Sequence, residues 1–173
     1  GTDGSASAVH WKSAPKNGLV IQFLFIFEAI GQDNLELGRY LSPVPILLNI
    51  NLDGTVYREE IPAHKGLKRI KPNSVVKLWE KCGERVELLT EKVVKAIQNM
   101  VKPMRTKAME KAKLILEGEK LRLQELTKIN PSVTHADVEA QEELNEVVYS
   151  AIADSSPRLD AIRLVLMETG ENG

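Results

Sequence analysis

One cluster of basic residues is the only group of neighbouring side chains in this sequence with an evident chemical use. His64, Lys65, Lys68, Arg69 and Lys71 fall within eight consecutive positions. Side chains of this charge can contact phosphate or an acidic partner. No aromatic residue is interleaved, which counts against a platform on which single-stranded bases stack. Two interpretations stay open: a polyanion or partner contact through Lys65, Lys68, Arg69 and Lys71, and a solvated loop that binds nothing.

The sequence contains no recognisable catalytic pattern. Neither a GxxxxGK[ST] phosphate loop nor a GxGxxG turn after a strand is present. The three histidines share no metal-ligand spacing with one another or with Cys82. Adjacent carboxylates such as Glu59 and Glu60 point apart on a strand or helix and make a poor acid–base pair. We therefore predict no catalytic, cofactor-binding or metal-binding residue.

Composition limits the class of protein. The chain has 173 residues, 43% of them hydrophobic and 27% charged, which is enough for a packed core. Its net charge of −1 gives no overall field that would attract nucleic acid or an anionic membrane. Cys82 is the only cysteine, which excludes an internal disulfide and fits a reducing cytosol. The apolar run at 19–27 is too short to span a bilayer, so we expect no membrane partner.

Strands are predicted on both sides of a tight turn. At 19–29, three phenylalanines alternate with other residues, so all three point to one side, towards a core. Residues 46–52 also alternate, and Asp53-Gly54 precedes a further run at 55–60. An Asp-Gly pair between two alternating runs is a strong hairpin signal.

A long amphipathic helix is predicted over residues 74–128, with apolar residues at alternating steps of three and four. Pro103 falls inside this pattern and predicts a kink or a break near 99–103. Asn130-Pro131 ends the helix. Thr134 then begins a second helix that reaches about residue 153, with Asp137 in its first turn. The short link makes the two helices an αα-hairpin.

The ends of the chain complete the expected organisation. Residues 1–16 read as a disordered linker or expression remnant, and 169–173 as a tail. A last strand is expected at 163–168, while 159–163 could still be helical. Together these features predict a single α+β domain over residues 17–168. Its small, mostly antiparallel sheet packs against the long kinked helix and its antiparallel partner.

Three stretches carry a resemblance to a known family. They are LVIQFLFIFEAIGQDNLELGRYLSPVPILLNINLDG at 19–54, LQELTKINPSVTHADVE at 123–139 and SSPRLDAIRLVLME at 155–168. In this order and spacing they resemble the C-terminal domain of the RapA family, bacterial RNA polymerase-associated ATPases of the Swi2/Snf2 type. The Asn130-Pro131 pair and the RLDAIRL segment are the most specific parts, and residues 1–16 lie outside the matched region.

The resemblance implies an accessory role. The parent protein would bind the RNA polymerase core and use ATP hydrolysis to remodel polymerase–nucleic-acid complexes, which helps polymerase recycle and activates transcription. ATP and Mg²⁺ would be held by helicase-like motifs upstream in the parent, and this fragment would neither bind a cofactor nor hydrolyse ATP. Its contacts would be polymerase and the ATPase lobes of the parent, with DNA or RNA reached through the parent. The implied location is the bacterial cytoplasm, at the nucleoid.

Two alternatives from other classes remain. The 64–71 segment would make the chain a nucleic-acid-binding module, with binding that weakens as salt rises. Alternatively, the apolar stripe of the long helix would pair with a second copy, which would make the chain a helical-arm adaptor or dimerisation domain.

Overall fold

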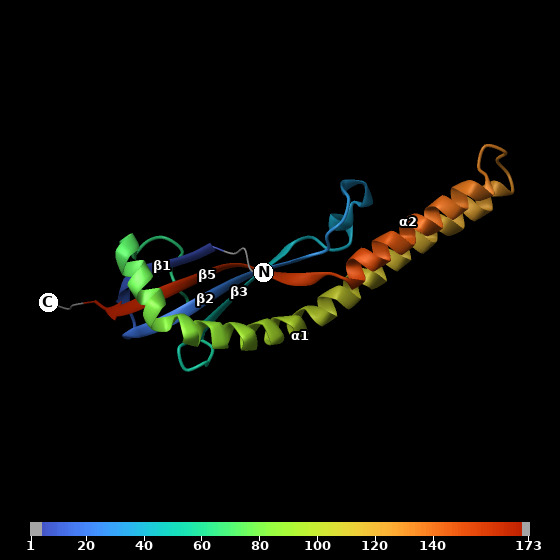
Figure 1. Cartoon of the computed structure of the whole chain (residues 1–173). Helices are drawn as coiled ribbons and strands as arrows, with labels where there is room; N and C mark the ends of the chain where they lie inside the picture. Colours follow the sequence, from blue (N-terminus) through green and yellow to red (C-terminus); the bar gives the residue numbers. More distant parts are fainter. Residues whose placement is uncertain (1–4, 171–173) are drawn as a thin grey trace. The chain divides into compact units, whose positions relative to one another are not determined.

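The computed structural model of this protein describes residues 5–170 and has the predicted α+β architecture, with five strands in one mixed sheet and two α-helices (Figure 1). The chain forms two compact units. The first comprises residues up to 26, residues 45–96 and residues from 158 onwards, and the second comprises 27–44 and 97–157. The single domain over 17–168 stays a prediction.

The sheet joins strands from both ends of the chain. In the order β3-β2-β5-β1-β4, its strands are Val44–Asn51, Gly18–Glu28, Ser156–Thr169, Ser5–Ala14 and Leu67–Arg69. β1 runs parallel to β5 and antiparallel to β4, so Val9 lies opposite Val165 on one side and Arg69 on the other. The sheet is therefore mixed, and its β1–β5 pair is parallel.

The first strand corrects the expectation of disorder over residues 1–16. Ser5–Ala14 forms β1, and of residues 1–16 only 1–4 lie outside the described part of the chain. The sequence of β1 is rich in Ser and Ala, so its apolar pattern is weak. The strand is held by backbone pairing to β5 and by burial of Trp11, neither of which is local. Of the predicted tail, Thr169 instead ends β5, and 171–173 lie outside the described residues.

Three further expectations change in the sheet. β5 begins at Ser156, so residues 159–163 are strand and not helix. The basic segment contains the three-residue strand β4. The strand expected at 55–60 is reduced to one bridge between Ile50 and Val56, because the chain then leaves the sheet and buries Tyr57.

Each face of the sheet has its own apolar layer in the first unit. The predicted row at 19–29 is buried, and the rings of Phe23 and Phe25 stack with centroids 6.5 Å apart. The first part of α1 contributes buried residues at Val86, Leu89 and Val93. A second cluster gathers Trp11, Ala14, Val20, Tyr57, Val165 and Met167. Segment 56–67 contributes to this cluster, so the side of β2 opposite the phenylalanines is covered as well.

The chain turns at Asp53-Gly54 as the sequence predicts, but of this pair only Gly54 has a positive φ, and the Gly54 N–H donates to the Asn51 carbonyl at 2.9 Å. The Asn51 N–H donates to the Thr55 carbonyl at 2.8 Å, and Gly54 has φ +93°. Arg85 of α1 fixes the turn from outside, since its Nε donates to the Leu52 carbonyl at 2.7 Å. The turn is therefore tied both to its own hairpin and to the long helix.

Replacing Gly54 by alanine is expected to lower the free energy of unfolding by about 1–2 kcal/mol, because an L-residue is strained at this φ. The added Cβ would also lie 3.4 Å from Cδ2 of Leu89. Urea denaturation followed by circular dichroism measures the change. Gly83→Ala in α1 is the matched control: its Cβ meets nothing within 4 Å, and it should stabilise the helix by up to about 1 kcal/mol. Equal effects of the two substitutions would contradict the argument.

The two helices follow the predicted pattern closely. α1 spans Pro72–Thr127 and is continuous through Pro103, so the break does not occur and the kink stays a prediction. α2 spans His135–Ala153, with Thr134 as its N-cap. The Thr134 N–H donates to Oδ2 of Asp137 at 2.8 Å, as the predicted capping pair requires. Among the described residues, neither helix has an apolar stretch of the length a bilayer crossing needs.

Candidate functional site

The structure does not gather the predicted basic residues into one patch. Lys65 lies in the turn before β4, Lys68 and Arg69 lie on β4, and Lys71 precedes α1. All four side chains are exposed. Successive residues of a strand point to opposite faces, so Lys68 and Arg69 diverge. Whether any of the four contacts a polyanion stays a prediction.

Arg69 instead belongs to a hollow at the edge of the sheet, which we call the β1-edge groove. Its volume is about 730 Å³. Strand β1, segment 63–70, the start of α1 and one residue of β5 line it; the lining residues are Ala6, Ser7, Ala8, Val9, Ala63, His64, Leu67, Arg69, Ile70, Pro72, Val75, Val76 and Arg163. The lining is mainly apolar, contains two arginines and holds no carboxylate.

Arg163 is the charged centre of this region. Its Nε donates to Oε1 of Gln22 on β2 at 2.6 Å, and its side chain is only partly exposed. Partial burial lowers the pKa of the Arg163 guanidinium, although the group remains charged at neutral pH. No carboxylate among residues 5–170 forms an ion pair with it. A neutral amide oxygen is thus its one hydrogen-bonding partner in the described part of the chain.

A second hollow of about 330 Å³ continues from the β1-edge groove across the same face. The two share Ser7, Ala63 and Arg163. The second is lined further by Leu24 and Leu47, and Leu47 is 58% exposed. Arg163 therefore lies where two hollows meet, with apolar surface on both sides.

Sequence reasoning did not single out Arg163. A charged residue inside an otherwise buried strand is the signal that could have marked it. The Gln22 partner could not be found this way, because it lies 141 positions away in the sequence.

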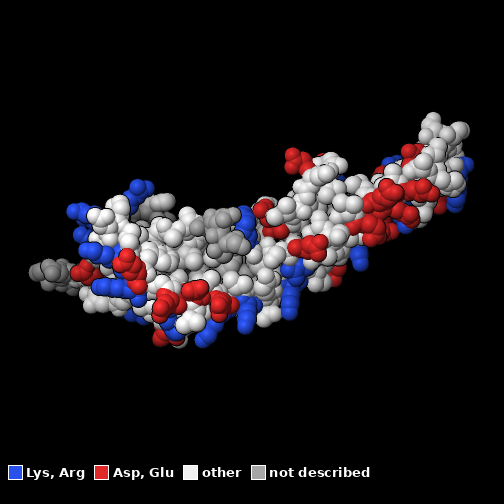
Figure 2. Space-filling view, viewed as in Figure 1, with Lys and Arg blue, Asp and Glu red and all other residues white. Residues whose placement is uncertain are grey.

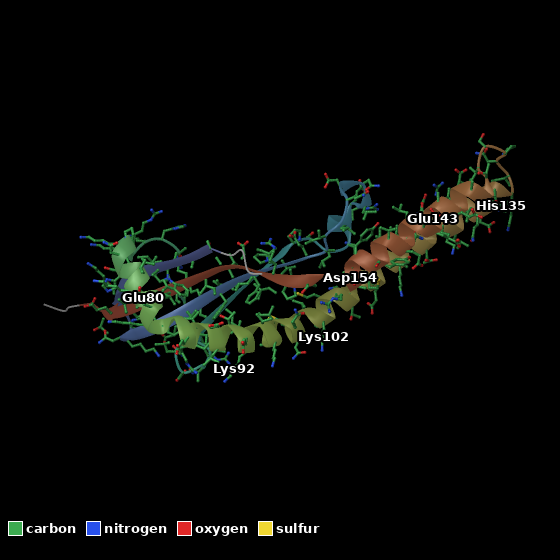
Figure 3. The ribbon with its side chains drawn as sticks, in the orientation of Figure 1. Glu80, Lys92, Lys102, His135, Glu143 and Asp154 are labelled. Atoms are coloured by element: carbon green, nitrogen blue, oxygen red, sulfur yellow. The ribbon has the colours of Figure 1, made fainter. Side chains whose placement is uncertain are left out.

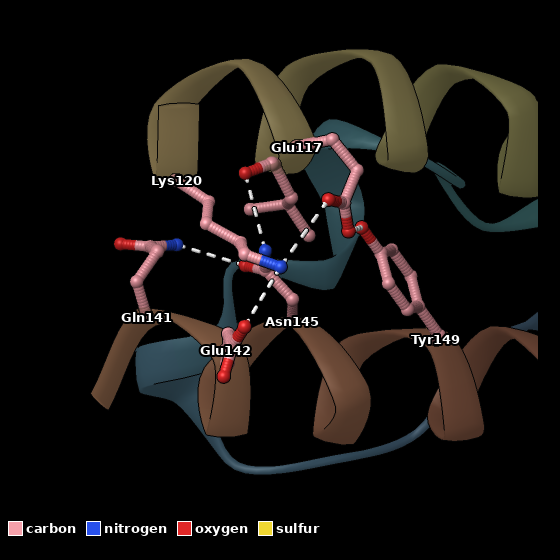
Figure 4. Close-up of polar contacts among 7 residues, drawn as sticks. Glu117, Lys120, Gln141, Glu142, Asn145 and Tyr149 are labelled. Atoms are coloured by element: carbon pink, nitrogen blue, oxygen red, sulfur yellow. Dashed lines mark hydrogen bonds and ion pairs between the residues drawn. The ribbon is translucent and has the colours of Figure 1, made fainter. Parts of the chain in front are cut away.

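The second unit contains a different polar cluster, between α1 and α2 (Figure 4). Asn145 is 1% exposed, and its Nδ2 donates to the carbonyl of Leu116 on α1 at 3.1 Å. Its Oδ1 accepts from Nε2 of Gln141 at 2.8 Å. Both ends of the buried amide are therefore satisfied, and the contact fixes the register of one helix against the other.

Partly exposed ion pairs surround this amide. Lys120 lies 2.8 Å from Oε1 of Glu142, and the Tyr149 hydroxyl donates to Oε1 of Glu117 at 2.9 Å (Figure 4). Burial, followed by the bond to Glu117, raises the pKa of Tyr149, so it stays protonated at any physiological pH. These contacts link helices and do not form a reactive centre, and we assign the cluster to packing.

Replacing Asn145 by leucine is expected to cost about 1–3 kcal/mol, because the buried Leu116 carbonyl loses a partner and Gln141 must find another. Thermal unfolding measures the loss. Glu143→Leu is the control on the same helix; Glu143 is exposed and labelled in Figure 3, and its change should stay within about 0.5 kcal/mol. A gain in stability on Asn145→Leu would show that the amide is not a stabilising link.

The side chain of Arg105 binds the backbone just after the C-terminus of α2. Nη2 of Arg105 donates to the carbonyl of Ser155 at 2.6 Å, and Nε donates to the same oxygen at 3.2 Å. The guanidinium lies over the ring of Phe27, 5.7 Å from its centroid. A positive charge next to unpaired carbonyls at a helix C-terminus is favourable, so this arginine also has a structural role.

Charge is distributed unevenly on the helical hairpin. In Figure 2, Asp and Glu gather over α2 on the visible face. α2 carries six acidic residues, Asp137, Glu139, Glu142, Glu143, Glu146 and, at its C-cap, Asp154. Such a surface repels polyphosphate. If the chain meets nucleic acid, the hairpin face shown in Figure 2 is poorly suited to the contact.

The fold and groove define an α+β domain with a cationic groove at a sheet edge; in residues 5–170 no three metal-binding side chains cluster. The chain matches the family described as RNA polymerase recycling family C-terminal over residues 2–167. It therefore belongs to that family.

Curated relatives agree with the family match. RNA polymerase-associated protein RapA of Pectobacterium carotovorum is 27% identical over 159 residues, which cover 90% of this chain and 16% of the relative. The protein of the same name from Haemophilus influenzae strain PittEE is 23% identical over 158 residues, covering 90% of this chain and 17% of the relative. The chain thus spans only about a sixth of the length of these relatives.

Proposed function

We propose that this chain is the non-catalytic C-terminal accessory domain of a larger, RapA-like ATP-dependent transcription regulator. The observation that carries the proposal is the family match over residues 2–167, combined with coverage of about a sixth of each relative. These relatives are named RNA polymerase-associated proteins.

Within such a protein the domain would brace the ATPase lobes or present a surface to RNA polymerase. The whole protein would promote polymerase recycling by remodelling polymerase–nucleic-acid complexes in the bacterial cytoplasm, at the nucleoid. ATP and Mg²⁺ would be bound by the ATPase lobes and not by this chain.

ATP hydrolysis by the chain itself tests the non-catalytic part. With Mg²⁺-ATP, in the presence and absence of DNA, phosphate release should stay at the buffer background. Turnover on the order of 1–10 per second, in the range of ordinary enzymes, would overturn the assignment.

Domain replacement tests the accessory part. The matched C-terminal residues of Pectobacterium carotovorum RapA would be deleted, or replaced by this chain. The deletion should weaken cosedimentation with RNA polymerase or reduce multi-round transcription while ATP hydrolysis persists, and the chimera should restore the loss. Full function of the deletion would refute an accessory role.

A dimerising helical arm is the second candidate, and one observation favours it. Leu114 and Leu121 are 80% and 59% exposed and lie seven residues apart on α1, so they share a helix face. Sedimentation equilibrium of the wild type and of a Leu114→Glu, Leu121→Glu variant tests it. A monomeric wild type at high concentration would exclude this candidate.

The nucleic-acid candidate has less support, since Lys68 and Arg69 diverge on β4. Its test is the salt dependence of oligonucleotide binding before and after neutralising the four predicted basic residues. An unchanged slope would remove it.

A further inference from the structure

The edge of β1 is only partly paired on one side. β5 pairs with β1 from Ser5 onwards, but β4 pairs with it only at Val9–Trp11. No other strand of the described chain lies along the β4 side of Ser5–Ala8. Alternate residues of this segment therefore direct N–H and C=O groups outwards, which is the arrangement that an added strand recognises.

The side chains along this edge leave room for another backbone. Residues 5–8 are Ser, Ala, Ser and Ala, with neither proline nor charge to block pairing. Two of the devices that usually protect a sheet edge, proline and charged side chains, are thus missing from Ser5–Ala8. The β1-edge groove, of about 730 Å³, lies along the same residues and continues past β4.

The groove also carries unbalanced positive charge. Ser7 is registered opposite Arg163, and Val9 opposite Arg69, so both arginines lie on the face to which Ser7 and Val9 point. The Nε–H of Arg163 donates to the amide oxygen of Gln22, so the Nη donors of Arg163 are available to a ligand. Arginine presents a planar fork that suits a carboxylate, and partial burial strengthens such a contact.

We propose that the β1-edge groove binds an extended, acidic peptide segment of a partner protein, which adds a strand beside Ser5–Ala8 and places a carboxylate on Arg163. Main-chain pairing supplies affinity, as in other β-strand additions. The glutamate or aspartate contact with Arg163, supported by Arg69, selects acidic sequences. Val75 and Val76 at the start of α1 contact apolar side chains that flank the acidic position.

The composition of the groove favours a peptide over nucleic acid. Nucleic-acid binding depends on neutralising several phosphates and on aromatic stacking of bases. The groove offers two arginines and His64, its remaining lining is largely apolar, and it contains no Phe, Tyr or Trp on which a base could stack. One or two carboxylates between apolar residues match this surface better than a row of phosphates.

Selection from a phage-displayed library of random peptides against the immobilised 173-residue chain tests the proposal. Enriched peptides should carry Asp or Glu flanked by β-branched residues. A fluorescein-labelled selected peptide should bind in an anisotropy titration, and replacing its acid by the amide should weaken binding about tenfold or more, as loss of a charge-assisted hydrogen bond predicts. Hydrogen exchange should show added protection at the amides of Ser5–Ala8.

Variants of the chain locate the contact. Arg163→Gln should weaken binding about tenfold, whereas Arg122→Gln, an exposed arginine of the helical hairpin, should leave it unchanged. Arg69→Gln alters an exposed side chain, so it keeps the fold even if Arg163→Gln does not, and it should weaken binding several-fold.

Three outcomes would overturn the proposal. Enrichment of peptides without acidic residues would refute the carboxylate–arginine contact. So would unchanged peptide affinity in both Arg69→Gln and Arg163→Gln, provided that the Arg163→Gln variant is folded. Protection elsewhere than at Ser5–Ala8 would remove the added strand. A single-stranded oligonucleotide that binds more tightly than the peptide, with the same dependence on Arg163, would assign the groove to a polyanion instead.

Discussion

Replacing Phe25 by alanine is expected to lower the free energy of unfolding by about 3–5 kcal/mol, which is the range for truncating a buried phenylalanine. Phe25 is 1% exposed and stacks on Phe23 within the interior strand β2. The substitution leaves a cavity in the buried row of phenylalanines, whose neighbours Phe23 and Phe27 are 0% exposed. Because small domains are stable by only about 5–15 kcal/mol, this loss would be a large fraction of the total.

Urea denaturation of the whole chain, followed by circular dichroism, measures the effect of Phe25→Ala. Leu47→Ala is the matched control in the same sheet, because Leu47 is 58% exposed; it should cost less than about 1 kcal/mol. If Phe25→Ala fails to fold, Phe25→Leu should still show a loss, of about 1–2 kcal/mol, because it removes less volume. A cost below 1 kcal/mol for a folded Phe25→Ala would show that the phenylalanine row is not the core.

Replacing Pro103 by alanine is expected to raise stability by about 1–3 kcal/mol. Pro103 lies inside the continuous helix α1 and is exposed. Proline provides no N–H for the carbonyl of Asn99 and crowds the preceding turn, at a cost near 3 kcal/mol in a helix interior. Because this position is exposed, water can hydrogen-bond to the unpaired Asn99 carbonyl and offset part of that cost. The expected gain in stability therefore extends down to about 1 kcal/mol.

Thermal unfolding of Pro103→Ala measures this gain. The control is Lys102→Ala at a neighbouring exposed position, labelled in Figure 3; it should change stability by less than about 0.5 kcal/mol. A loss of stability in Pro103→Ala would contradict this prediction. It would mean that the native geometry of α1 depends on the proline. Assays of the domain's partners would then be repeated with this variant.

Several elements could be read from the sequence because their causes are local. The capping pair at Thr134 and Asp137, the Asp53-Gly54 turn and the alternating phenylalanines each depend on residues a few positions apart. Helical and strand periods differ, so they identify the element and its buried face. The same reasoning places no strand at Ser5–Ala14, because its small polar residues carry too weak a pattern.

Short-range sterics and periodic burial account for the helical hairpin, the tight turn and the apolar face of β2, so these features follow from local sequence. Three other features are visible only in the folded chain: the strand at Ser5–Ala14, the parallel pairing of β1 with β5, and the contact of Arg163 with Gln22 beside a groove. The physical reason is that these features come from pairing between the two ends of the chain. Such pairing depends on which distant segments meet, and no local spacing records it.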